Sequence, residues 1–115
     1  FYIYYDSNSK QYSCGTIVKG PTIAGCEGTN ASVSLGIPTN NITVCAFFHC
    51  HTTLEYCPST VSRATGPSSA DKSFATTNKL PGILYDYSIK KLVGGMKKDA
   101  SYKVYTFGPS QRVFP

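Results

Sequence analysis

The sequence has no tryptophan, one methionine and only six acidic residues among 115. No apolar run approaches the ~20 residues that a membrane-spanning helix needs, so we expect no membrane span. Heptads and a three-residue glycine period are missing too, which excludes a coiled coil and a collagen-like chain. The few carboxylates are scattered, and neither a nucleophile elbow nor a phosphate-binding glycine loop is present. No common enzyme motif is therefore recognisable.

Aromatic and turn-forming residues are abundant: the chain has nine Tyr, six Phe, ten Gly and seven Pro. Aromatic and β-branched residues between regular breaks favour strands, and the length suits one domain, residues 1–115. Strand signals cover residues 1–5, 32–35, 43–48, 52–56, 83–89, 101–107 and 111–114. In the segment 83–89, alternation places Tyr85 and Tyr87 on one face and Asp86 on the other. The pattern predicts a β-rich fold with at most one or two short helices.

Three segments lack strand character. Residues 59–78 are polar, and we expect them to form a long surface loop that carries binding contacts. The composition of residues 90–98 predicts a basic hairpin or loop around a glycine pair. Any helix would fall in 16–26 or 59–64, although neither segment has sustained helical periodicity.

The five cysteines all fall in the first half of the chain, together with two glycosylation sequons. The cysteines are Cys14, Cys26, Cys45, Cys50 and Cys57, and the sequons begin at Asn30 and Asn41. Clustered cysteines and sequons are typical of an oxidising compartment, so we expect a secreted, disulfide-stabilised glycoprotein whose signal peptide has been removed. The connectivity is left open, because two disulfides and one free thiol allow 15 arrangements.

Two histidines lie among these cysteines, which raises the alternative of a zinc site. His49, Cys50 and His51 are contiguous, so in a strand Cys50 points away from both histidines. Structural zinc sites usually present paired ligands on tight knuckles. We therefore expect disulfides and two solvent-facing histidines, with no metal and no cofactor.

Charge is distributed unevenly along the chain. Residues 72–115 contain eight basic and two acidic residues, whereas residues 1–71 are nearly neutral. The candidate binding residues in this basic half are Lys90, Lys91, Lys97, Lys98, Lys103, Tyr85 and Tyr87. Such a surface attracts phosphate, although lysines on exposed hairpins also serve solubility and block edge pairing.

Four short segments carry a resemblance to a known family. They are Tyr12-Ser13-Cys14-Gly15, residues 84–89, residues 102–105 and residues 111–113. In order and spacing they resemble the small secreted fungal ribonucleases and their non-catalytic relatives, the RNase-like effectors associated with powdery-mildew haustoria. The Tyr-x-Cys motif of those effectors is similar to Tyr12-Ser13-Cys14. The resemblance covers both ends of the chain and leaves the middle unmatched.

The resemblance implies an α+β fold in which a central antiparallel sheet packs on one short helix. It also implies that Asp86 occupies the position of the general base and Lys103 that of the transition-state arginine. The two catalytic histidines of the family have no counterpart near these positions, since His49 and His51 lie far back in the sequence. RNA cleavage needs both an acid and a base, so we expect Asp86 and Lys103 to be vestigial.

The leading hypothesis is therefore a secreted, non-catalytic RNase-like virulence effector that binds a host protein, such as an immune receptor, or RNA. One alternative is a β-rich extracellular recognition domain of a pathogen or viral surface glycoprotein. A further alternative is a weakly active secreted ribonuclease that uses Asp86 and Lys103.

Overall fold

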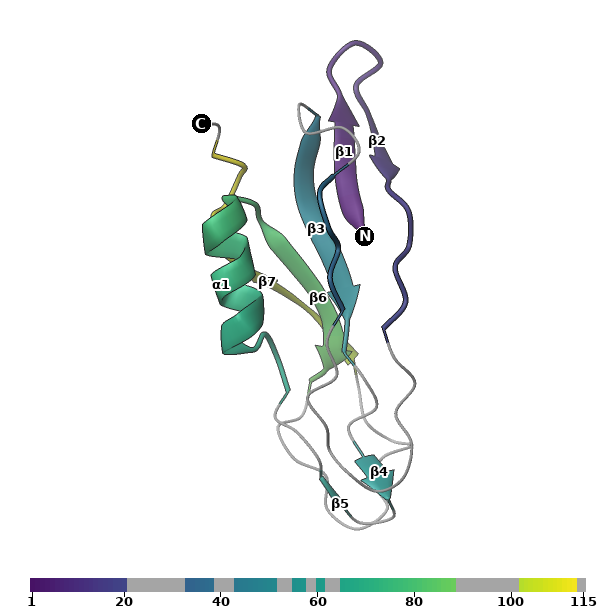
Figure 1. Ribbon diagram of the computed structural model, residues 1–115, viewed down its shortest axis with the longest axis vertical. Helices are drawn as coiled ribbons and strands as arrows, with labels where there is room; N and C mark the ends of the chain where they lie inside the picture. Colours follow the sequence, from purple (N-terminus) through teal and green to yellow (C-terminus); the bar gives the residue numbers. More distant parts are fainter. Residues whose placement is uncertain are drawn as a thin grey trace.

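The computed structural model is an α+β domain with one mixed sheet (Figure 1). It describes residues 1–20, 33–38, 43–51, 65–88 and 102–113, and the backbone of 55–57 and 60–61. In chain order the elements are β1 (Tyr2–Asp6), β2 (Gln11–Cys14), β3 (Val44–Cys50), β4 (Glu55–Cys57), β5 (Thr60–Val61), α1 (Ser69–Asn78), β6 (Gly82–Tyr87) and β7 (Tyr102–Phe107). The five-stranded sheet has the order β2-β1-β3-β6-β7, and β4 pairs with β5 separately.

The centre of the sheet departs from the expected antiparallel arrangement. Strand β1 is antiparallel to β2 and β3, and β7 is antiparallel to β6, but β3 and β6 are parallel. The reason is the connection between these two strands. Helix α1 lies between β3 and β6 in the sequence, and this crossover returns the chain to the end of the sheet at which β3 began. The expectation of a wholly antiparallel sheet is therefore wrong, whereas one short helix on a sheet is confirmed for the described residues.

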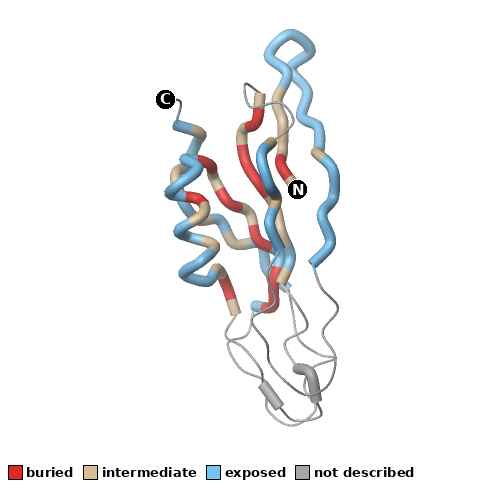
Figure 2. Tube along the Cα trace, in the orientation of Figure 1, coloured by how far each residue is buried: buried red, intermediate tan, exposed pale blue. Residues whose placement is uncertain are grey.

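The core lies between α1 and one face of the sheet, where buried segments face one another (Figure 2). It consists of Tyr2, Val44, Phe47, Ala75 and Leu80. The Phe47 ring meets the rings of Phe74 and Phe107 edge to face. Residues from three strands and from the helix thus share one apolar cluster.

Helix α1 occupies the second half of the segment 59–78, for which the sequence predicted a surface loop. A capping box begins it: Asp71 N–H donates to the Ser68 hydroxyl, and Ser68 N–H donates to the Asp71 carboxylate. Lys79 ends it in the left-handed region at φ 55°. The loop prediction is wrong for residues 69–78, because local capping and tertiary packing sustain a helix whose apolar content is too low for a periodic signal.

Other sequence predictions have mixed outcomes. The strands predicted at 1–5, 43–48, 83–89 and 101–107 correspond to β1, β3, β6 and β7. Strand β2 was missed, and residues 33–35 and 111–113 are not strands. No helix occupies 16–20. The hairpin predicted at 90–98 lies outside the described residues.

The described cysteines give no support to disulfide stabilisation. Cys14, Cys45 and Cys50 are free thiols, and the side chains of Cys26 and Cys57 lie outside the described part of the chain. The Cys45 thiol instead approaches the Ile3 carbonyl oxygen at 3.4 Å. Within the described residues, no helix has the length and apolar character that crossing a bilayer requires.

Candidate functional site

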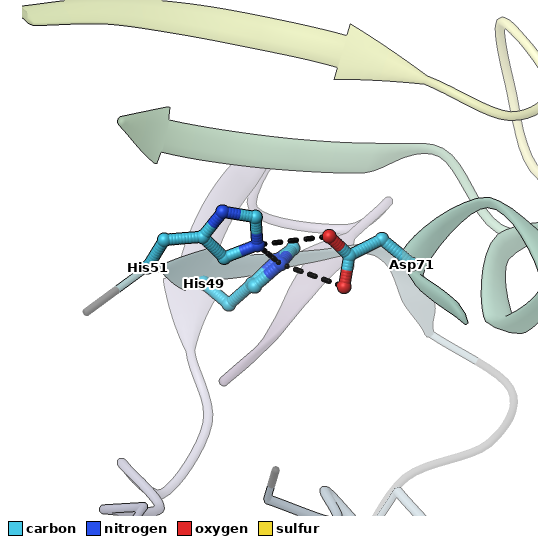
Figure 3. Close-up of side chains that lie close together, drawn as sticks. All are labelled: His49, His51 and Asp71. Carbon is cyan, nitrogen blue, oxygen red and sulfur yellow. Dashed lines mark hydrogen bonds and ion pairs between the residues drawn. The ribbon is translucent and has the colours of Figure 1, made fainter. Parts of the chain in front are cut away.

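Four titratable side chains meet where β3, β6 and α1 come together. His49 lies in β3, His51 directly follows that strand, Asp71 lies in the first turn of α1, and Asp86 lies in β6. The two histidines share a face because strand side chains alternate, and their rings turn toward Asp71 (Figure 3). We call His49, His51, Asp71 and Asp86 the histidine–carboxylate cluster.

The parallel register of β3 and β6 explains how residues so far apart in sequence meet. His49 pairs with Leu84 and Cys50 with Tyr85, so the next residue, His51, comes level with Asp86. The His51 Nδ1 atom is 3.0 Å from Asp86 Oδ2, and its Nε2 atom is 2.9 Å from Asp71 Oδ2. One imidazole therefore bridges two carboxylates.

His49 completes the cluster. The His49 Nε2 atom lies 3.1 Å from Asp71 Oδ1 and 3.3 Å from His51 Nε2. The side chains of His49, His51 and Asp71 are 22%, 17% and 18% exposed, so solvent reaches them only in part. The prediction of two solvent-facing histidines is wrong, because α1 packs against this face and supplies Asp71.

Asp86 is the innermost member, at 2% exposure. Its carboxylate accepts hydrogen bonds from the backbone N–H groups of Gly66 and Tyr87, at 2.9 and 2.7 Å, besides its contact with His51. A carboxylate in this position is sequestered by the protein.

The contacts determine the protonation of the cluster. Burial opposes the charged form of His51, but hydrogen bonds and the charges of Asp71 and Asp86 outweigh it and raise the His51 pKa. Burial also opposes ionisation of Asp71, yet hydrogen bonds from the two histidines and from Ser68 N–H hold its pKa far below the usual range. The contacts therefore favour the charged forms of both His51 and Asp71.

One atom of the cluster is unsatisfied. Among the described residues, His49 Nδ1 is a buried side-chain nitrogen with no hydrogen-bond partner. Such an atom costs free energy, of the order of 1–3 kcal/mol, and native proteins contain few of them.

The two residues assigned from the ribonuclease resemblance are neighbours across strands. Asp86 and Lys103 are direct Cα partners in β6 and β7. Lys103 is exposed, and its ammonium lies 4.8 Å from the centroid of the Tyr105 ring. The sequence expectation that no histidine accompanies Asp86 is wrong, because sequence separation ignores the parallel pairing that places His51 beside it.

The opposite face of β6 and β7 carries the tyrosines. The Tyr102 ring stacks on Tyr87 and on Tyr85, with centroid distances of 4.7 and 5.2 Å. Tyr85 is 42% exposed and Tyr102 53%, whereas Tyr87 is buried. We call Tyr85, Tyr87 and Tyr102 the tyrosine stack. The sequence had singled out Tyr85 and Tyr87 but not Tyr102.

The remaining predicted site residues lie outside the described part of the chain. They are Lys90, Lys91, Lys97, Lys98, Asn30 and Asn41. Asp71 was not predicted as a site residue. The signal that could have found it is Ser68-Ser69-Ala70-Asp71, a helix-capping pattern that would have placed a carboxylate at the start of a helix.

Comparison with protein-family models, curated proteins and solved structures gives no match to this chain.

Proposed function

We propose that this chain is a secreted, non-catalytic RNase-like effector that binds single-stranded RNA through the tyrosine stack. The observation that carries the RNA part is the exposure of two mutually stacked rings, Tyr85 and Tyr102, on a sheet face. Aromatic rings exposed on a sheet are platforms for unpaired bases, and stacking is worth about 1–3 kcal/mol per base. The eight basic residues of the second half supply attraction for phosphate.

The burial of Asp86 supports the non-catalytic part of the proposal. In a ribonuclease of the resembled type this residue would take the proton of the 2′-hydroxyl. Here its oxygens are engaged by two backbone N–H groups and by His51. An occupied and buried carboxylate favours a structural role for Asp86 over a role as base.

The test is binding of a fluorescently labelled single-stranded oligouridylate RNA to the full chain. We expect affinity to fall steeply as salt rises, because bound counterions are released from the phosphates. We expect Tyr85→Ala combined with Tyr102→Ala to weaken binding at least about tenfold, because two stacking surfaces are lost.

The matched control is Tyr12→Ala. Tyr12 is 70% exposed, and its ring lies against Tyr5 at the other edge of the sheet. This change also removes an exposed tyrosine, but it leaves the tyrosine stack intact, so affinity should be retained. No RNA binding at low salt, or an equal loss in both variants, would contradict the RNA proposal and favour the protein partner that the sequence left open.

A further inference from the structure

We propose that His49, His51 and Asp71 bind a zinc ion, and that Asp86 orients His51 through the hydrogen bond to its Nδ1 atom. This inference is independent of RNA binding, since it concerns the other face of the sheet. The zinc site weighed from the sequence combined the two histidines with the neighbouring cysteines, whereas this one combines them with Asp71. Two imidazoles and one carboxylate form a donor set of borderline hardness that suits zinc better than calcium or magnesium.

The positions of the three donor groups agree with tetrahedral coordination. Metal–ligand bonds of 2.0–2.1 Å place neighbouring ligand atoms of a tetrahedron about 3.3–3.4 Å apart. The two Nε2 atoms of His49 and His51 are 3.3 Å apart, and His49 Nε2 is 3.1 Å from Asp71 Oδ1. One ligand atom from each of the three residues lies within 4.8 Å of the others. The ligand atoms of all three residues are therefore close enough together to share one ion.

The surroundings of the ligands have the form of a metal site. A ligating histidine usually donates its second N–H to a carboxylate or carbonyl, which fixes the ring and its tautomer. The Asp86 carboxylate accepts a hydrogen bond from His51 Nδ1 at 3.0 Å. It also accepts hydrogen bonds from the backbone N–H groups of Gly66 and Tyr87. Asp71 is held by Ser68 N–H at 2.8 Å. Two of the three ligands are therefore positioned by further hydrogen bonds.

The two carboxylates favour a cation at the same place. Asp71 lies within 3.1 Å of both histidines, and Asp86 lies 3.0 Å from His51. Two carboxylates balance the two positive charges of a zinc ion. The partial exposure of the three ligands leaves the ion a route from solvent. A fourth coordination position is left for water or for a ligand atom of a partner.

The test is competition for zinc between the metal-free full chain and a chromogenic chelator. We expect one zinc ion per chain. His49→Gln and Asp71→Asn should each weaken binding at least about 100-fold, because each removes or weakens a ligand. Asp86→Asn should weaken it about 10- to 100-fold, as expected for a residue that orients a ligand.

The matched control for folding is Val44→Ala. It destabilises the apolar core but changes no ligand and no group that positions a ligand. Zinc affinity should therefore stay within a few-fold of the unmodified chain. Cobalt provides a second readout: imidazole and carboxylate ligands give visible bands without the thiolate charge-transfer band that cysteine ligands produce. The proposal is overturned if His49→Gln binds zinc as tightly as the unmodified chain, if no zinc binds, or if the cobalt spectrum is that of a thiolate site.

Discussion

At the scale of single residues, the charge of His51 depends on two carboxylates that the fold brings to it. Its two nitrogens face Asp71 and Asp86 at 2.9 and 3.0 Å. The folded protein therefore binds the His51 proton more tightly than the unfolded chain does. Stability must depend on pH wherever the two states bind different numbers of protons.

We predict that the histidine–carboxylate cluster contributes most to the stability of the metal-free protein in mildly acidic solution. The raised His51 pKa stabilises the fold fully below the unfolded value of about 6.5, and this contribution is lost as pH rises through the folded pKa. The lowered Asp71 pKa stabilises the fold above about pH 4, and that contribution is lost as pH falls. In urea unfolding with EDTA, His51→Gln should therefore cost more free energy of unfolding near pH ~5.5 than near pH ~9.

The control for this pH dependence is Val44→Ala. Val44 is 2% exposed and carries no titratable group, so its replacement should cost the same free energy of unfolding at both pH values. A loss for His51→Gln that is equal at the two pH values, or larger at high pH, would show that the imidazolium is not held by the carboxylates.

At the scale of elements, α1 depends on its first turn. Two reciprocal hydrogen bonds stabilise this turn. Asp71 N–H donates to the Ser68 hydroxyl at 3.1 Å, and Ser68 N–H donates to the Asp71 carboxylate at 2.8 Å. We predict that Ser68→Ala lowers the free energy of unfolding by about 1 kcal/mol, the usual cost of losing a serine cap. Chemical denaturation followed by circular dichroism measures this difference.

The control is Ser73→Ala within the same helix. Ser73 is exposed, and alanine has the higher helix propensity, so stability should be unchanged or should rise by a few tenths of a kcal/mol. Equal losses in the two variants would mean that the capping box does not stabilise α1.

The same elements explain how far the sequence could be used to predict the fold. Alternation correctly predicted β6, with Tyr85 on one face and Asp86 on the other, because a strand imposes a period of two. Helix α1 was missed because only Phe74 and Ala75 contribute to the core, which leaves no apolar stripe. Its capping pattern is a local signal, but this pattern predicts a helix start only when the residues that follow are already known to be helical.

The site was less predictable than the strands. Strand parity does place His49 and His51 on one face, as the sequence implied. Their carboxylate partners, however, are brought by the parallel pairing of β3 with β6 and by the crossover through α1. Pairing between strands distant in sequence depends on the packing of the whole sheet, which no local pattern encodes.

At the scale of the whole molecule, an aromatic core unites strands that are far apart in the sequence. Tyr2 of β1, Phe47 of β3 and Phe107 of β7 lie in or against the same cluster, which α1 covers with Phe74 and Ala75. Burial of an aromatic or aliphatic side chain is worth about 1.5–3 kcal/mol, so several such residues can stabilise a domain of this length. The described part of the fold therefore has an apolar core that stabilises it without covalent links between the strands.

We predict that at least three of the five cysteines are free thiols. Cys14 and Cys50 are exposed and unpaired, and Cys45 is half-buried beside the Ile3 carbonyl, so at most one disulfide can form within the chain. Alkylation of the denatured, unreduced protein, followed by intact-mass measurement, should give three or more modifications. Reduction before thermal unfolding should accordingly shift the midpoint little, because the apolar core remains in place. Two disulfides in the monomer, or loss of cooperative unfolding on reduction, would mean that covalent links rather than the aromatic core hold β1, β3 and β7 together.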